Sequence, residues 1–197
     1  MIEAHALYGL AWIAFGFSHS LLAANAVKAY LKPLLGRGYR LAYNLVALVS
    51  VALVVAVGWR LFQGAASFAV PRPLAATMIA AQVAGVGTLI AGLMRYDLGR
   101  FAGTAQLRKG FAEPEDEPLR IDGIHRWVRH PIYAGGFLIL WGRASDPLSL
   151  ATAVWGSLYL LVGMALEERK LLGLYGEAYA RYRSHVPALI PWKGPAS

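Results

Sequence analysis

The 197-residue sequence contains no cysteine. Disulfide bonds, thiolate zinc sites, iron–sulfur clusters and a cysteine nucleophile are therefore all excluded. Charged residues are also scarce, at 15% against 57% hydrophobic residues. That balance is far more apolar than the composition of a soluble domain. Apolar runs of about 20 residues, long enough to cross a bilayer, recur along the chain, so we predict an all-α integral membrane protein.

Basic residues are missing from the start of the chain: no Lys or Arg precedes the first apolar run, and the charged or ionisable residues there are Glu3 and His5. A secretory signal peptide needs a positively charged segment at this place. Residues 24–26 do resemble a cleavage site, but without that segment we expect the first apolar run to be a retained helix.

Five transmembrane helices are predicted within a single domain of residues 1–197, at about 4–24, 41–62, 74–94, 131–143 and 147–166. The fourth is short, because about 12 helical residues span only about 18 Å, against a hydrocarbon core of about 30 Å. Whether it crosses fully is left open. Asp146 followed by Pro147 predicts a capped start for the fifth helix.

A stripe of small residues marks the third of these helices. Ala80, Ala84, Thr88 and Gly92 recur at every fourth position, which predicts that they share one face. Small residues allow two helix backbones to approach closely in a membrane. We therefore expect another helix to pack against this stripe.

The basic residues predict the orientation in the membrane. Residues 25–40, 95–130 and the tail from 168 carry 16 of the 19 Lys and Arg residues, and five spans place all three segments on one side. By the positive-inside rule that side is cytoplasmic. The prediction is a multi-pass protein of the bacterial inner membrane, with its N-terminus outside and its C-terminus in the cytoplasm. The net charge of +8 is thereby explained without nucleic acid.

The residues from Asp122 to Gly136 form a basic, glycine-bounded segment that carries His125 and His130 and leads into an apolar run. Pro131 suits the first position of a helix. The segment before it then lies at a helix N-terminus, where free N–H groups and the macrodipole favour an anionic ligand.

A second charged cluster, Glu167-Glu168-Arg169-Lys170, follows after an apolar hairpin. The five-span topology brings both clusters to the cytoplasmic face. We predict that this C-terminal helical hairpin frames one cofactor pocket there, with residues 95–192 as the catalytic part.

The two clusters carry a family resemblance. Residues 129–135 (RHPIYAG), the paired glutamates and residues 175–191 resemble the C-terminal half of the isoprenylcysteine carboxyl methyltransferase superfamily. The match is closer to the methanethiol S-methyltransferases and NnrU-like membrane proteins. The segments that resemble this branch are residues 19–23, 96–106 and 159–168.

The resemblance implies a membrane methyltransferase that uses S-adenosyl-L-methionine (SAM) and releases S-adenosyl-L-homocysteine. The methyl acceptor would be a small or lipophilic molecule, with a thiol as the leading expectation. Membrane lipids are the other expected partners. The residues predicted to bind the cofactor are Gln106, His125, Arg129, His130, Tyr133, Gly135, Glu167, Glu168 and Tyr179.

Three residues are predicted to act in catalysis: Arg129, His19 and Glu168. A thiol must lose its proton before it attacks the sulfonium, and His19, His125 or Arg129 could take the proton or favour the anion. The sequence leaves these three open. His19 lies inside a predicted span, where an ionisable side chain is costly unless it is partnered or functional. No metal site is predicted.

Other interpretations remain open at this stage. The arginines at residues 126 and 129 could simply anchor a helix at the cytoplasmic surface, and the paired glutamates could form a surface ion-pair cluster of little energetic weight. The enzyme alternative is an NADPH-dependent, sterol-reductase-like protein. The third alternative is a non-enzymatic membrane protein of the NnrU type.

Overall fold

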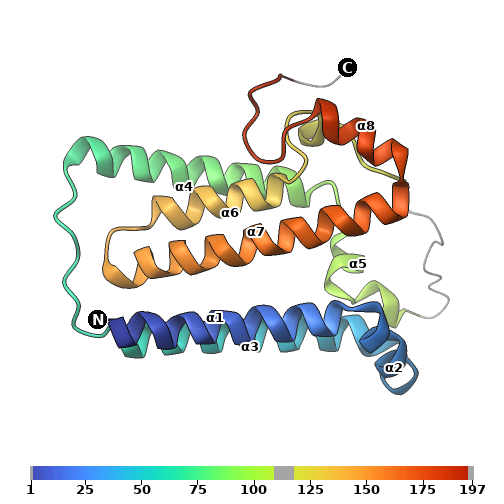
Figure 1. The fold of residues 1–197 in the computed structure, drawn as a ribbon, viewed down its shortest axis with the longest axis horizontal. Helices are drawn as coiled ribbons and strands as arrows, with labels where there is room; N and C mark the ends of the chain where they lie inside the picture. The colour runs from blue at the N-terminus through green and yellow to red at the C-terminus, as the bar shows by residue number, and fades with distance from the viewer. Residues whose placement is uncertain (1, 109–117, 195–197) are drawn as a thin grey trace. The chain divides into compact units, whose positions relative to one another are not determined.

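The computed structural model describes residues 2–108 and 118–194, and the regular structure within these ranges is entirely helical. The all-α prediction is therefore confirmed. The chain divides into two compact units, residues 1–65 with 96–115, and residues 66–95 with 116–197. Each unit is described by itself below, with the helix labels of Figure 1.

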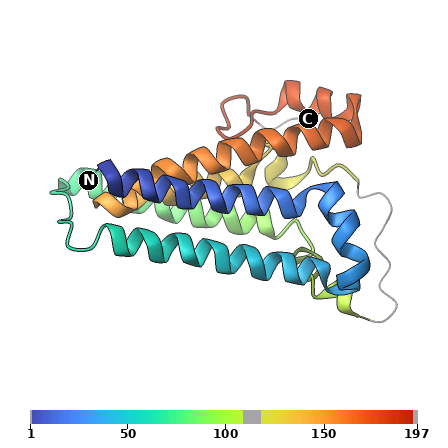
Figure 2. The same ribbon diagram turned by 60° about the horizontal axis from the view of Figure 1, so that its bottom comes forward.

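The first unit is built on two long apolar helices, α1 (Ile2–Ala23) and α3 (Tyr39–Leu61). They lie side by side in both ribbon views (Figures 1 and 2). The Tyr39 hydroxyl donates a hydrogen bond to the Leu22 carbonyl and fixes one end of the pair. The short helix α5 (Leu98–Ala102) and a 3₁₀ turn (Ala105–Leu107) complete the unit.

The connection between α1 and α3 is itself helical, as α2 (Asn25–Leu35) and a 3₁₀ turn (Gly36–Gly38). The basic residues of 25–40 are typical of a polar connection between two spans, so this helix was not predicted. Apolar residues nevertheless recur there at helical spacing, at Val27, Tyr30, Leu31 and Leu34, and this amphipathic period is what forms the helix.

The second unit contains four helices, α4 (Arg72–Leu93), α6 (Pro131–Gly142), α7 (Pro147–Tyr175) and α8 (Glu177–His185), and a 3₁₀ turn (Gly123–Arg126). The predicted helix starts at Pro131 and Pro147 are confirmed. The Asp146 carboxylate accepts a hydrogen bond from the Ser149 N–H at 2.9 Å, and the Ser149 hydroxyl binds back to the Asp146 N–H. This capping box stabilises the first turn of α7.

Helix α7 extends nine residues beyond the predicted end at residue 166. Glu167 and Glu168 therefore lie on a rigid helix rather than in a tail. A helix presents residues i and i+1 about 100° apart, so the two carboxylates point in different directions. Glu167 and Glu168 therefore have different neighbours.

Helices α4 and α6 pack closely at glycines. A Cβ atom placed on Gly135 would lie 2.6 Å from the Gly85 carbonyl oxygen, and one on Gly85 would lie 2.8 Å from that of Gly135. Gly92 of the predicted stripe also lies in this contact, beside Pro131 and Ile132. Ala80 and Ala84 are exposed instead. The close approach was thus predicted correctly, but its face is centred on Gly85.

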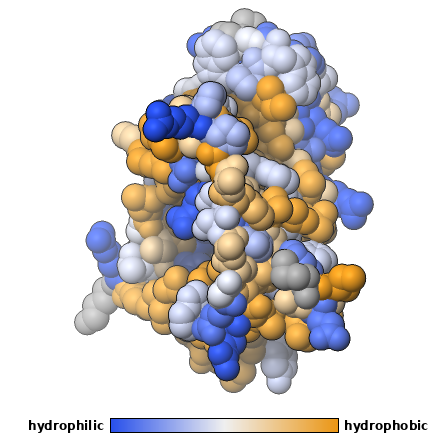
Figure 3. Space-filling model, turned by 90° about the vertical axis from the view of Figure 1, so that its left-hand side faces the viewer, coloured by the Kyte–Doolittle hydropathy of each residue, from blue (hydrophilic) through white to orange (hydrophobic). Residues whose placement is uncertain are grey.

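Among residues 2–108 and 118–194, four helical stretches are long and apolar enough to cross a membrane: Ile2–Ala23, Asn25–Leu61, Arg72–Leu93 and Pro147–Tyr175. Helix α6, with 12 residues, is shorter. Large hydrophobic side chains such as Leu48, Val83 and Val162 are exposed on these helices, and Figure 3 shows hydrophobic residues on the surface between hydrophilic ones. The protein is an all-α membrane protein; five complete crossings stay a prediction.

Candidate functional site

The segment before α6 is held by the C-terminal part of the second unit. The Arg129 N–H donates to the Pro187 carbonyl at 2.9 Å, and the His130 N–H donates to the Ala188 carbonyl at 3.0 Å. Val186, directly before this pair, is 1% exposed. Two backbone hydrogen bonds and a buried side chain therefore fix the turn that leads into the helix at Pro131.

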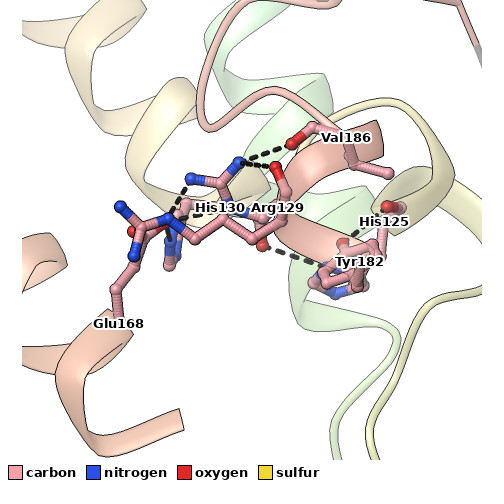
Figure 4. Close-up of polar contacts among 7 residues, drawn as sticks. His125, Arg129, His130, Glu168, Tyr182 and Val186 are labelled. Carbon is pink, nitrogen blue, oxygen red and sulfur yellow. Dashed lines mark hydrogen bonds and ion pairs between the residues drawn. The ribbon is translucent and has the colours of Figure 1, made fainter. Parts of the chain in front are cut away.

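The Arg129 guanidinium lies at the centre of the site (Figure 4). Its Nε donates to Oε1 of Glu168 at 2.9 Å, and its Nη2 donates to the same oxygen. Its Nη1 donates to the carbonyls of Arg183, at 3.2 Å, and of Val186. The side chains of Arg129 and Glu168 are only 9% and 13% exposed, so this ion pair is largely desolvated.

Glu168 receives further donors from both sides. Nε2 of His130, on a side chain that is 3% exposed, lies 3.1 Å from Oε1, and Nε of Arg183 lies 3.3 Å from Oε2. Figure 4 shows the carboxylate of Glu168 directed at this group from α7. The predicted meeting of the two sequence clusters is confirmed. The Glu168 carboxylate is already well supplied with donors from the chain itself.

A histidine and a tyrosine fasten the 3₁₀ turn to the same site. Nδ1 of His125 lies 3.3 Å from the Arg129 carbonyl oxygen, and the Tyr182 hydroxyl donates to the His125 carbonyl at 2.7 Å. His125 is 4% exposed. Burial lowers the pKa of His125 below its ordinary value of 6.5, and this effect outweighs the hydrogen bond to Arg129.

Tyr179, on α8, is 1% exposed, and its hydroxyl has no hydrogen-bond partner within the described residues. Burial raises the pKa of Tyr179, and the nearby Glu168 carboxylate raises it further, against the opposing effect of Arg129. Tyr179 therefore belongs to the same buried cluster as Arg129 and Glu168.

Two other predicted residues border this site from α6 and α7. The ring of Tyr133 packs edge-on against that of His130, with centroids 5.4 Å apart, and its hydroxyl lies over Gly163 of α7. Glu167 is partly exposed. Its carboxylate forms no salt bridge or side-chain hydrogen bond with any residue that the structure describes.

The remaining predicted residues form other contacts. Gly135 faces α4, where the close helix approach explains why a glycine stands there. His19 and Gln106 belong to the first unit. Nε2 of His19 lies 2.7 Å from the Tyr43 hydroxyl, and the amide nitrogen of Gln106 donates to the Arg100 carbonyl at 3.2 Å.

Sequence reasoning missed several residues of the site. The sequence gives no reason to single out Arg183 as a partner of Glu168, because other basic residues stand near it in α8. Tyr182 lies within residues 175–191, which carry the family resemblance, but nothing in its spacing points to a hydrogen bond with the turn before α6. Arg95 pairs with Asp122, and its guanidinium lies against Gly123, whose φ of +58° suits glycine. Within the described residues no group of His, Asp and Glu could hold a metal ion.

Comparison with known proteins places the chain in a family. Residues 7–145 match the sequence profile of the family described as "NnrU protein". The chain belongs to the NnrU family. No solved structure matches it.

This NnrU-family chain is similar to curated methyltransferases. It is 38% identical over 100 residues to a methanethiol S-methyltransferase of Crocosphaera subtropica, covering 48% of this chain and 38% of the relative. It is 28% identical over 183 residues to methanethiol S-methyltransferase 1 of Bradyrhizobium diazoefficiens, covering 91% and 64%. A protein-S-isoprenylcysteine O-methyltransferase of Schizosaccharomyces pombe is 32% identical over 83 residues, covering 39% and 34%. The chain thus spans less than two thirds of the length of these relatives.

Proposed function

We propose that this NnrU-family protein is a membrane methyltransferase, which transfers a methyl group from SAM to a small or lipophilic acceptor, with a thiol as the acceptor class. The reaction class is supported by the relatives named methanethiol S-methyltransferase. The observation that carries the proposal for the site is the meeting of Arg129, His130 and Glu168 at one desolvated carboxylate.

The residues around this cluster fit SAM chemically. SAM carries a sulfonium and an ammonium, so its site needs an anionic group, and Glu167 offers a carboxylate without a salt bridge among the described residues. SAM also carries an adenine and a ribose with hydroxyl groups. Tyr133, which is partly exposed, offers an aromatic face, and such faces attract cations and stack on flat rings.

The adjacent glutamates receive different roles in this proposal. Glu168 is occupied by Arg129, His130 and Arg183, so a direct bond to the cofactor would have to displace one of them. We assign Glu168 and Arg129 to positioning: they tie α7, the turn before α6 and the C-terminal segment together. Glu167 is assigned to the cofactor.

SAM supplies an electrophilic methyl group on a positively charged sulfur. The thiolate sulfur of the acceptor forms a bond to the methyl carbon while the bond from that carbon to the sulfonium sulfur breaks, giving a thioether and S-adenosyl-L-homocysteine. Opposite charges are neutralised in this step, so the protein helps by excluding water and by aligning the two sulfurs with the methyl carbon. The desolvation of the cluster around Glu168 supports such a dry environment.

The thiol proton needs an acceptor. His125 stays neutral at pH 7, because its pKa lies below the ordinary value, and a neutral imidazole can take a proton. Its Nδ1 is engaged by the Arg129 carbonyl. Arg129 stays protonated and cannot take the proton, although its positive charge could favour the thiolate. His19 belongs to the first unit, where it pairs with Tyr43.

The placement in the membrane is part of the proposal. Four helices are long enough to cross, and α6 would supply the fifth crossing by bringing its short apolar stretch beside α4 and α7. With five crossings the basic segments share the cytoplasmic side. The site would then open to the cytoplasm, where SAM is available.

The test is transfer of labelled methyl from SAM by the purified protein to a panel of thiols, lipids and carboxylates. We expect labelled thioether from thiols. If only lipids or only carboxylates became labelled, the acceptor would belong to that class and not to the thiols. A calorimetric titration with SAM and with NADPH distinguishes a methyltransferase from the NADPH-dependent reductase. Binding heat with NADPH and none with SAM would favour the reductase.

A further inference from the structure

Arg183 is fastened to the buried cluster at two points. Its backbone carbonyl accepts a hydrogen bond from Nη1 of Arg129 at 3.2 Å, and Nε of its side chain lies 3.3 Å from Oε2 of Glu168. Its side chain is nevertheless 49% exposed, whereas that of Arg129 is 9% exposed. Arg183 is therefore held in place by the cluster while its side chain stays half open to solvent.

The two arginines differ in how far their donors are used. Nε and Nη2 of Arg129 donate to Glu168, and its Nη1 donates to two backbone carbonyls. Arg129 is thus occupied within the chain and is a poor site for the carboxylate of a ligand. The terminal nitrogens of Arg183 form no hydrogen bond with any residue that the structure describes. Since a guanidinium carries five N–H donors, Arg183 keeps a pair of nitrogens for a second carboxylate.

The salt bridges of the cluster, as far as the structure describes them, leave one positive charge without a counter-ion. Arg129 and Arg183 both lie against Glu168, so two permanent positive charges share one carboxylate. An excess of one sign is costly where a charge is largely desolvated, as that of Arg129 is. A carboxylate beside Arg183 would balance the excess, and it suits a guanidinium because it accepts two parallel hydrogen bonds.

Glu167 supplies a negative charge nearby. It forms no salt bridge with Arg183 or with any other residue in the described ranges. Burial and the Glu168 carboxylate raise the pKa of Tyr179, and the Glu167 carboxylate adds a smaller effect in the same direction, so Glu167 lies near the Tyr179 ring. Tyr179 and Arg183 are residues i and i+4 of α8 and share one face of that helix. An acid and a base with capacity for a ligand therefore lie near the same face of α8.

This pair of charges is complementary to an α-amino acid, whose ammonium and carboxylate are attached to one carbon. SAM ends in such a group. Resting on the function proposed above, we propose that Arg183 binds the carboxylate of the methionine part of SAM, while Glu167 binds its ammonium. Only two methylene groups separate this end of the cofactor from the sulfonium, so binding here also fixes where the methyl group is presented to the acceptor.

The test compares three ligands by isothermal titration calorimetry with the purified protein in detergent. They are S-adenosyl-L-homocysteine, its decarboxylated analogue, and methylthioadenosine, which lacks the whole amino acid group. Arg183→Gln should weaken S-adenosyl-L-homocysteine binding by about tenfold, because a hydrogen bond between charged groups is worth about that factor. The same variant should bind the other two ligands as the unaltered protein does, because neither carries a carboxylate. Unchanged methylthioadenosine binding also shows that the pocket remains folded.

Glu167→Gln separates the two charges. It should weaken the binding of S-adenosyl-L-homocysteine and of the decarboxylated analogue, since both keep the ammonium, and leave methylthioadenosine binding unchanged. Arg181→Gln is the matched control for Arg183→Gln, because it removes the same charge from an exposed position of α8. This control should bind all three ligands as the unaltered protein does.

The outcomes separate this inference from the proposed function. If the unaltered protein and Arg183→Gln bound S-adenosyl-L-homocysteine equally well, Arg183 would not contact the carboxylate, and the methyltransferase proposal would stand without it. Equal losses for all three ligands in Arg183→Gln would assign this arginine to the fold, and equal losses in Arg181→Gln would assign the effect to charge at a distance; either overturns the inference. If the unaltered protein bound none of the three ligands, the proposed function itself would fail.

Discussion

Arg129 and Glu168 are 39 residues apart in the sequence, yet Nε of the arginine lies 2.9 Å from the carboxylate of the glutamate. Both side chains are nearly nine-tenths buried or more. The same arginine also binds two carbonyls of the C-terminal segment. One ion pair therefore connects α7, the turn before α6 and the end of the chain, and its loss should disturb all three.

Glu168→Ala should destabilise the protein by about 3 kcal/mol, because removal of one partner leaves a desolvated charge without its counter-ion. The measurement is the melting temperature of the purified protein in detergent. Arg169→Ala is the matched control, since this neighbour is exposed and should change stability by less than about 0.5 kcal/mol. Combining Glu168→Ala with Arg129→Ala should cost less than the sum of the single changes. Strict additivity would show that the pair does not act as a unit.

Glu167→Gln should leave the melting temperature unchanged and weaken SAM binding by about tenfold, the usual weight of a hydrogen bond to a charged group. The side chain forms no salt bridge within the described residues, so its loss costs the fold little. Isothermal titration calorimetry gives the dissociation constant. Glu177→Gln, an exposed acid on α8, should bind SAM as the unaltered protein does. If Glu167→Gln also bound SAM normally, Glu167 would not contact the cofactor.

Gly135→Ala should lower stability by roughly 1–3 kcal/mol, the usual cost of overpacking a tight interface. Its Cβ would lie 2.6 Å from the Gly85 carbonyl oxygen, a backbone atom that can move only with α4. Gly87→Ala is the control on α4, because nothing lies within 4 Å of a Cβ there. That change should raise helix stability by about 0.5–1 kcal/mol. Equal melting temperatures for the two variants would contradict the close packing of α4 and α6.

The stability of the protein should depend on pH through His125. Its pKa is lowered by burial, so below the ordinary value of 6.5 the unfolded chain binds a proton that the folded protein does not. Stability should thus be constant above about pH 6.5 and fall as the pH drops below it. Melting temperatures between pH 5 and pH 8 test this, and His125→Gln should reduce the slope below pH 6.5. A slope that His125→Gln leaves unchanged would assign the dependence to other groups.

The sequence alone determined the class of the molecule. Long apolar runs and few charges specify membrane-spanning helices because unpaired backbone groups are too costly in lipid. Pro131, Pro147 and Asp146 specified helix starts, because a proline fixes φ and lacks an N–H and an aspartate caps free N–H groups. Such signals act within a few residues, so they can be read without the fold. The two charged motifs were also predicted to meet.

Only the tertiary structure decided what the charged residues do when they meet. Sequence spacing does not tell which of two adjacent glutamates faces an arginine 39 residues away; that depends on the rotation of α7 about its axis and on the path of the C-terminal segment. The sequence also does not show which face of α4 packs against α6. That face is centred on Gly85, because the contact depends on the position of the neighbouring helix. Ion pairs and helix contacts join distant residues, and their partners are selected by the fold as a whole.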